Sequence, residues 1–393
     1  MTREIVVVGA ARTAIGTFGG SLKDVPMTRL ATEATRAALE RSKVAPDQVG
    51  HVVFGNVIPT EPNDAYLARV AALDSGLPKE VPAFNVNRLC GSGLQAIVSA
   101  AQAIRLGDTD IAIGGGAESM SRGPFFALDA RWGTKMGDSR SIDYMLGILH
   151  DPWHKIHMGI TAENVAERFH VSRQDQDALA AESHRRAAHA IEAGYFREQI
   201  APVEIATRKG VTVFDTDEHV RADTTAESLA GLKPVFRKDG TVTAGNSSGI
   251  NDAAAAVVLA EAGRAERDGL VPLARLVGYA HAGVEPELMG IGPIPATRKV
   301  LERTGIKVDD LDVIESNEAF AAQACAVARE LGFDPAKVNP NGSGISLGHP
   351  VGATGAIITT KAIYELQRIK GRYALVTMCI GGGQGIAAIF ERL

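Results

Sequence analysis

The sequence predicts a layered α/β protein made of two copies of one domain, and two observations support this. Similar blocks recur in the same order about 262 residues apart: ATRAALERSKV begins at Ala34 and ATRKVLERTGIKV at Ala296, and Gly93 and Gly355 lie in the matching segments CGSGLQAI and PVGATGAI. In each copy a helical pattern precedes a short apolar run, a glycine-bounded helical pattern and a second apolar run. This alternation is typical of α/β folds with a mostly buried sheet.

The length and composition fit a globular protein with more than one domain. The chain has 393 residues, 45% hydrophobic and 22% charged, whereas single cores stop growing near ~250–300 residues. The net charge of −5 gives no basis for binding nucleic acid, and no apolar run approaches the ~18 residues of a membrane span. Three widely spaced cysteines form neither a disulfide framework nor a zinc pattern. We therefore expect free thiols, no bound metal and a cytoplasmic location.

The elements of the first copy follow in order from the amino terminus. The apolar run from Ile5 to Ala11 predicts a strand rather than a signal peptide, because no longer apolar core or cleavage site follows. A second apolar run ends at Asn56, and DIAIGGG ends at Gly116. LVTMCIGGG in the second copy ends at Gly383. We expect a glycine turn after the strand in both copies.

The stretch from about 120 to 246 has no counterpart in the second copy and holds seven of the ten histidines. We interpret it as an insertion that supplies a binding surface, after which GNSSGINDAAAAVVLAEA returns to the first domain. The predicted domains are residues 1–119 with 247–270, the inserted residues 120–246, and residues 271–393.

Cys90 is the first candidate for chemistry, in NVNRLCGSGLQAI. A small core residue is the ordinary explanation for a lone cysteine. Here the next segment is helical by its spacing, so Cys90 lies at or near a helix amino terminus, where free N–H groups and the helix dipole stabilise a thiolate. Glycines 91 and 93 let a planar acyl group approach the backbone.

Three further residues are candidates because of their positions in the second copy. His349 lies among glycines on a turn. With an offset of 262, the position in the second copy that matches Cys90 is 352, three residues beyond His349. In a pseudo-twofold pair the cysteine and histidine could meet and form an activated nucleophile. Cys379 ends an apolar run before three glycines, and Asn317 opens NEAF, where it is either a helix N-cap or an exposed amide. Cys325 lies among alanines and is expected to be structural.

The glycine-rich segments do not indicate a nucleotide cofactor. GAARTAIG follows the first strand but lacks GxGxxG spacing, and neither GGG segment opens a dinucleotide fingerprint with its later acidic residue. We expect no cofactor.

Together the motifs NVNRLCGSGLQAI, GGGAESMS, HMGITAENVA, TAGNSSGINDAA, NEAFAAQ, NPNGSGISLGHPVGATG and CIGGGQG resemble the thiolase family over nearly the whole chain. The resemblance is greatest to short-chain biosynthetic thiolases, acetyl-CoA acetyltransferases of the kind that feed polyhydroxyalkanoate synthesis. It implies a duplicated five-layered α/β/α/β/α fold with a loop domain inserted in the first half. It also implies a reversible Claisen condensation of two acetyl-CoA to acetoacetyl-CoA and CoA through an acyl-cysteine, and a homotetramer.

The resemblance assigns catalytic roles to matching residues. Cys90 resembles the nucleophile, His349 its base, and Cys379 the acid/base for the α-carbon of the second acyl-CoA. Asn317, through a water, and His349 resemble one oxyanion hole, and the backbone N–H groups of Cys90 and Gly381 resemble the other.

The resemblance also assigns coenzyme A and acyl contacts to eight residues, most of them in the insertion. Without it, we would interpret Arg221 as a solvated charge. The residues are Leu149 along the tunnel, His157 and Met158 near the pantetheine and substrate, Arg221 and Ser228 near the adenosine phosphates, Ser248 at the pantetheine, and Met289 and Phe320 around the acyl end.

Four alternatives stay open. A degradative 3-ketoacyl-CoA thiolase of broader chain length is one, because the same groups run in reverse give thiolysis of a 3-ketoacyl-CoA. Decarboxylating ketoacyl synthases also use a cysteine, but a second cysteine before GGG argues against them. A non-catalytic lipid-binding relative could dispense with both cysteines and His349, and a cysteine hydrolase would release free acid. The loop 123–137, rich in aromatic and basic residues, is either an oligomer contact or a lid over the site.

Overall fold

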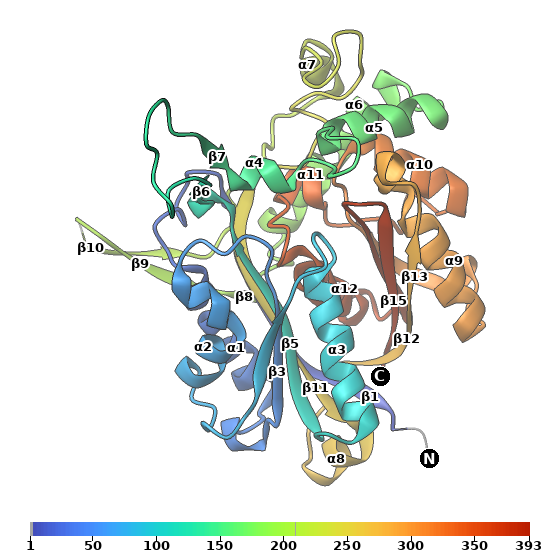
Figure 1. The fold of residues 1–393 in the computed structure, drawn as a ribbon. Helices are drawn as coiled ribbons and strands as arrows, with labels where there is room; N and C mark the ends of the chain where they lie inside the picture. The colour runs from blue at the N-terminus through green and yellow to red at the C-terminus, as the bar shows by residue number, and fades with distance from the viewer. Residues whose placement is uncertain (1–2, 209) are drawn as a thin grey trace.

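One large mixed sheet organises the protein. A computed structural model describes residues 3–208 and 210–393, and within them eleven strands form this sheet, in the order β13-β14-β15-β12-β1-β11-β5-β3-β4, with β2 on β11 and β8 on β1 (Figure 1). The strands are β1 (Ile5–Thr13), β2 (Gly16–Thr17), β3 (His51–Gly55), β4 (Ala83–Val86), β5 (Ile111–Ser119), β8 (Ile200–Ala201), β11 (Asn251–Glu261), β12 (Ala274–Gly283), β13 (Leu311–Ser316), β14 (Tyr373–Ile380) and β15 (Gln384–Arg392).

The two halves of the sheet have the same topology. In the first half β1 is antiparallel to β11, β11 is antiparallel to β5, and β5 is parallel to β3. In the second half β12, β15, β14 and β13 repeat these relations in the same order. The halves join where Val6 of β1 pairs with Arg275 of β12. The predicted duplication is confirmed.

Helices lie on both outer faces and between the halves (Figure 1). On the outside of the first half α1 packs on β1 and β11 and α2 on β3 and β4, whereas α9 packs on β12 and β15, with α10 beside it. Between the halves α3 packs against α12, α3 on β5 and α12 on β14. These helices are α1 (Met27–Ser42), α2 (Leu67–Asp74), α3 (Ser92–Leu106), α9 (Pro293–Thr304), α10 (Ala321–Leu331) and α12 (Thr354–Ile369).

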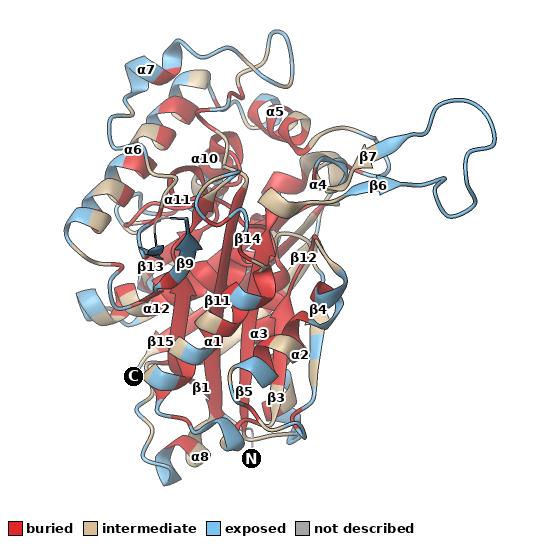
Figure 2. Ribbon diagram, turned by 90° about the vertical axis from the view of Figure 1, so that its left-hand side faces the viewer, coloured by how far each residue is buried: buried red, intermediate tan, exposed pale blue. Residues whose placement is uncertain are grey.

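Small residues in the strands let these layers approach closely. Residues 253–260 of β11 are all fully buried, as expected for a strand covered on both faces (Figure 2). A Cβ on Gly114 would lie 2.5 Å from the Cα of Ile97 in α3, and one on Gly116 would lie 2.3 Å from the carbonyl oxygen of Gly352. The expected glycine turn at 114–116 is therefore wrong, because these glycines continue β5 and permit close contact.

The segment between β5 and β11 takes the place of the short turn that joins β14 to β15 in the second half. It contains β6 (Phe125–Ala127), β7 (Ser141–Asp143), α4 (Tyr144–Ile148), α5 (Met158–Arg168), α6 (Arg173–Glu192), β8, β9 (Val203–Thr207), β10 (Gly210–Phe214) and α7 (Ala226–Ala230). A 3₁₀ turn, Met120–Arg122, begins this long segment. Outside it, the short helices are α8 (Ala262–Arg267) and α11 (Gly344–Leu347), and the 3₁₀ turns are Pro46–Gln48, Pro62–Tyr66, Pro286–Ile291 and Val308–Asp310.

A buried ion pair anchors this long segment to the first half. Both guanidinium amino groups of Arg12 on β1 bond the carboxylate of Asp217, at 2.7 and 2.9 Å, and both side chains are fully buried. Asp217 also accepts the N–H of Ile15 at 2.9 Å. The contact fixes the segment ahead of Arg221 relative to the sheet.

No helix in the described part of the chain combines the length and apolar character needed to cross a bilayer.

Candidate active site

Both halves and the long segment contribute to one cavity of about 240 Å³ near the ends of β5 and β14. Nine of the predicted site residues line it: Cys90, Leu149, His157, Met158, Ser248, Met289, Phe320, His349 and Cys379. Asn317 and Gly381 lie against residues of this cavity, whereas Arg221 and Ser228 lie away from it on the surface. The cavity is mostly apolar and holds two thiols and an imidazole.

Cys90 occupies a tight turn between β4 and α3. Leu89 has a φ of 45°, and the Ser92 hydroxyl accepts the N–H of Arg88 at 2.8 Å while donating to the Leu89 carbonyl at 2.7 Å. Gly91 packs closely on this strand end, since a Cβ there would lie 2.5 Å from the terminal methyl group of Ile380 and would displace it. The turn therefore brings Cys90 to the end of β14, which carries Cys379.

The surroundings of Cys90 disfavour its thiolate. Although Cys90 is only half-buried beside the open cavity, the loss of solvation raises its pKa to about 11, while the N–H groups of Gly381 and of Cys90 itself oppose the rise. The start of α3 therefore does not by itself give the stabilised thiolate that the sequence predicts, because the loss of solvation opposes the nearby donors. Cys90 therefore needs a base.

His349 can serve as that base. Burial lowers its pKa to about 4, so the imidazole is neutral at pH 7 and can accept a proton. The side-chain oxygen of Asn251 accepts a hydrogen bond from the backbone N–H of His349 at 2.9 Å and so fixes the turn that carries the imidazole. The His349 Nδ1 lies 2.6 Å from the Thr354 hydroxyl.

Asn317 lies just beyond the end of β13. Its Nδ2 is 3.4 Å from the Nε2 of His349, and its backbone N–H donates to the Thr377 carbonyl at 3.0 Å. The N-cap interpretation is wrong, because α10 begins four residues later, at Ala321. The fully buried amide instead lies beside the imidazole, where it could polarise a bound oxygen.

Cys379 is fully buried near the end of β14, directly before the 381–383 turn. Burial raises the pKa of its thiol strongly, and the nearby Cys90 raises it further. Gly382 and Gly383 have φ of 78° and 79°, which favours glycine in this turn. The turn directs the Gly381 N–H at Cys90.

Aromatic and sulfur-containing side chains form the wall of the cavity. His157 caps α5 by accepting the Gly159 N–H at 3.0 Å, and its ring stacks on Phe236 with centroids 4.7 Å apart. Phe236 meets Phe320 edge-on at 6.2 Å. The sequence analysis missed Phe236, although a lone aromatic residue between charged neighbours in KPVFRKDG was a usable signal. It also missed the lining residues Met120, Leu146, Ser247, Gly249, Ile250, Ala319 and Val351.

Glu118 is a buried carboxylate that the sequence analysis also missed. It accepts the Asn56 side-chain amide at 2.8 Å, the N–H groups of Val57 and Ile58 at 3.1 and 3.0 Å, and that of Gly352 at 2.8 Å. Burial raises its pKa to about 8, but because every partner is a donor, the geometry fits the ionised form. Glu118 thus ties the turn after His349 to the half that carries Cys90.

Arg221 and Ser228 are exposed in the long segment. The Arg221 N–H donates to His184 Nδ1 at 3.1 Å, but its guanidinium makes no ion pair within residues 3–208 and 210–393. Ser228 lies on α7 and exchanges hydrogen bonds with Thr225. Both stay predictions as coenzyme A contacts.

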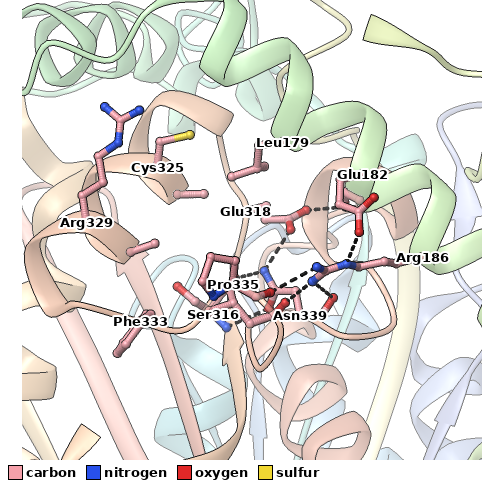
Figure 3. Close-up of a pocket in the computed structure, with 14 residues that line it drawn as sticks. Leu179, Glu182, Arg186, Ser316, Glu318, Cys325, Arg329, Phe333, Pro335 and Asn339 are labelled. Carbon is pink, nitrogen blue, oxygen red and sulfur yellow. Dashed lines mark hydrogen bonds and ion pairs between the residues drawn. The ribbon is translucent and has the colours of Figure 1, made fainter. Parts of the chain in front are cut away.

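A second cavity, of about 270 Å³, lies between α6, α10 and the loop after α10 (Figure 3). It contains Cys325, whose burial raises its pKa to about 12 and which fits the predicted structural role. Arg329 pairs with Asp175 and Arg186 with Glu182. The buried Glu318 accepts hydrogen bonds from Ser183 and Asn339. None of the catalytic candidates lines this second cavity.

Within the described residues, no group of three or more histidine, cysteine, aspartate or glutamate side chains is placed to hold a metal ion.

Comparison with known proteins decides the family. The thiolase N-terminal domain model matches residues 5–263, and the thiolase C-terminal domain model matches residues 270–392. The chain belongs to the thiolase family. This thiolase is 68% identical over 394 residues to the beta-ketothiolase BktB of Cupriavidus necator, with 100% of both chains covered. It is 48% identical over 398 residues to an acetyl-CoA acetyltransferase of Syntrophomonas wolfei, again with 100% of both covered.

Solved structures agree. This thiolase superposes on human mitochondrial 3-ketoacyl-CoA thiolase with a TM-score of 0.98 at 45% identity, covering 100% of this chain and 99% of the other. The acetyl-CoA acetyltransferase of Bacillus anthracis also gives a TM-score of 0.98, at 48% identity and the same coverage. The predicted fold class and family are confirmed.

Proposed function

We propose that this thiolase is an acetyl-CoA C-acetyltransferase that reversibly condenses two acetyl-CoA into acetoacetyl-CoA and CoA. The observation that carries the proposal is the convergence of Cys90, His349 and Cys379 on one cavity. A nucleophile, a neutral base and a second thiol are the groups that this chemistry needs. The high identity to a beta-ketothiolase and to acetyl-CoA acetyltransferases supports the same reaction.

The first half-reaction acylates Cys90. The Cys90 thiol proton moves to the Nε2 of His349 as the sulfur attacks the acetyl carbonyl carbon of acetyl-CoA. The resulting oxyanion collapses, the bond from carbon to the CoA sulfur breaks, and that sulfur takes the proton from Nε2. The low proton affinity of the buried imidazole favours this return. The Gly381 N–H, aimed at Cys90, can donate to the oxyanion.

The second half-reaction forms the carbon–carbon bond. Cys379 first passes its thiol proton to the neutral His349, which lines the same cavity. The Cys379 thiolate then removes a proton from the α-carbon of a second acetyl-CoA, and the enolate attacks the acetyl group on Cys90. Acetoacetyl-CoA is released, and the departing Cys90 thiolate takes the proton back from His349, so all three side chains return to their starting forms. The amide of Asn317, through a water, and the protonated Nε2 of His349, 3.4 Å from it, would donate hydrogen bonds to the enolate oxygen. Thiolysis is the same path in reverse.

A degradative 3-ketoacyl-CoA thiolase of broader chain length is the second candidate. Its support is the 46% identity to mitochondrial 3-ketoacyl-CoA thiolase of Bos taurus and the similar human structure. The deciding experiment is thiolysis by the purified protein of acetoacetyl-CoA, 3-ketovaleryl-CoA and progressively longer 3-ketoacyl-CoAs. Undiminished kcat/KM on long chains favours the second candidate, and no thiolysis of any of them rejects both.

Arg221 tests the coenzyme A surface. We expect Arg221→Ala to raise KM for CoA in thiolysis roughly three- to tenfold, because an exposed contact to phosphate contributes at most about 1.5 kcal/mol. The kcat should change little, since the contact is similar in the ground and transition states. The measurement is initial-rate kinetics beside Arg185→Ala, which removes another exposed arginine, on α6. An unchanged KM for CoA would mean that Arg221 is a solvated surface charge that does not contact CoA.

We propose a cytoplasmic homotetramer, with domains at 1–119 plus 247–270, 120–246 and 271–393, and polyhydroxyalkanoate precursor synthesis as its use. The loop between β6 and β7 supports the assembly: it projects away from the body, as Figure 2 shows, so it does not fold back as a lid. Leu128, Trp132 and Met136 on it are 62%, 87% and 95% exposed. Apolar side chains gathered on a projecting loop are typical of an interface.

Removing that loop tests the assembly. Ala127 pairs with Ser141, so an Asn-Gly turn can replace residues 128–140 without disturbing β6 and β7. We expect light scattering at micromolar concentration to show tetramers for the intact protein and dimers for the variant, with Cys90 acylation retained. An intact protein that is monomeric refutes the assembly, and a tetramer that survives the deletion has its contacts elsewhere.

A further inference from the structure

The Thr354 hydroxyl contacts His349 at Nδ1, while the other ring nitrogen, Nε2, lies beside Asn317. Its Oγ1 lies 2.6 Å from the His349 Nδ1 and donates to the Pro350 carbonyl oxygen at 2.9 Å. A hydroxyl has only one hydrogen, so a hydrogen bond to the Pro350 oxygen leaves the Thr354 oxygen to accept from an Nδ1–H. This arrangement favours a ring proton on Nδ1.

The opposite ring nitrogen is then fixed as the acceptor. A neutral imidazole has a single N–H, so a proton on Nδ1 leaves Nε2 with a free lone pair. A second contact agrees with this tautomer, because the Asn317 Nδ2 lies 3.4 Å from Nε2 and, as an amide nitrogen, can only donate. Nε2 is the atom that takes the Cys90 proton in the proposed function.

We propose that Thr354 is the positioning residue of His349, holding the imidazole in the one tautomer that can deprotonate Cys90. The proposal rests on the proposed function, since it gives His349 the role of base. Thr354 is suited to this task because it is the first residue of α12, it is only 2% exposed, and its backbone N–H bonds the same Pro350 oxygen at 2.9 Å. The first turn of α12 and the Thr354 hydroxyl therefore both hold the turn that follows His349.

The choice of a hydroxyl has a chemical consequence. A carboxylate at this position would stabilise the imidazolium and keep the proton on His349. A neutral hydroxyl orients the ring without adding negative charge, so the proton passes readily to the leaving CoA sulfur. Thr354 thus orients the base while leaving its proton affinity low.

The kinetic test compares Thr354→Val, Thr354→Ser and Thr359→Val. We expect Thr354→Val to slow acetylation of Cys90 by acetyl-CoA about 100-fold or more, with KM changed less than about threefold, because the wrong tautomer cannot accept the thiol proton. Thr354→Ser should restore most of the rate. Thr359 is the control: it is also a buried threonine on α12 and bonds the Gly355 carbonyl at 2.7 Å.

The tautomer itself is read by ¹⁵N NMR of histidine-labelled protein, with His349 assigned by its loss in His349→Asn. We expect Nε2 to give the signal of an unprotonated ring nitrogen in the wild type and to gain proton in Thr354→Val, or in Thr354→Ala if the valine variant does not fold. A protonated Nε2 in the wild type overturns the proposal, as does acetylation of Thr354→Val at the wild-type rate. If the wild type gives the expected ¹⁵N signals but never acetylates Cys90, the proposed function is rejected. The inference that Thr354 fixes the tautomer of His349 would still hold.

Discussion

Replacing Cys90 with serine should lower kcat in both directions by roughly 1,000-fold or more. The Cys90 thiol has a pKa of about 11, and it already depends on His349 as the base that removes its proton. The pKa of that imidazole is about 4, so even the thiol transfers its proton uphill. An alcohol loses its proton far less readily than a thiol, and no described residue offers a stronger base at this position. The matched control is Cys325→Ser, on α10 in the other cavity, which should retain the wild-type rate.

A separate labelling experiment locates the intermediate. Wild-type protein is incubated with acetyl-CoA, quenched in acid and digested, and mass spectrometry should find the acetyl group on the peptide that carries Cys90. Its presence on Cys379 alone, or on no cysteine, contradicts the assignment of the nucleophile.

Replacing Cys379 with alanine should separate the two half-reactions. We expect Cys379→Ala to acetylate Cys90 and release about one CoA per subunit, and then to stop, because no group remains to remove the α-proton of the second acetyl-CoA. The small side chain fits the apolar surroundings of Met158, Met289 and Phe320, so the fold should be retained.

Rapid-quench measurement of CoA and acetoacetyl-CoA gives both quantities for Cys379→Ala. A melting temperature near that of the wild type shows that the variant is folded. The division of roles is wrong if this folded variant fails to acetylate Cys90, or if it still forms acetoacetyl-CoA at the wild-type rate.

Much of the fold could be predicted because it follows from local pattern and from repetition. Apolar runs and helical spacing repeat about 262 residues apart, and the two matching halves of the large sheet follow from that order. The turn predicted at glycines 114–116 was wrong because the motif GGG has two uses in this protein. Between β14 and β15 it forms a turn, and in β5 it makes room for α3. Only the packing of another helix distinguishes these uses.

The reactive residues of the site could be predicted, but their electrostatics could not. The resemblance and the local motifs indicated Cys90, His349 and Cys379, which the structure places in one cavity. The pKa of Cys90 depends on burial by distant segments, which outweighs the local helix terminus that the sequence shows. Phe236 and Glu118 were missed for a similar reason, since their partners lie on other elements.

The way the long segment joins the sheet makes this thiolase modular. Its two ends leave and re-enter on neighbouring strands, where Ser119 pairs with Asp252. Cys90, His349 and Cys379 all lie outside it, so a graft between these two positions would exchange the surface around them, provided that it keeps Asn251, whose side chain holds the backbone of the His349 turn. New acyl or carrier preferences could therefore be installed by recombination at this one junction, provided that the graft also restores a partner for Arg12.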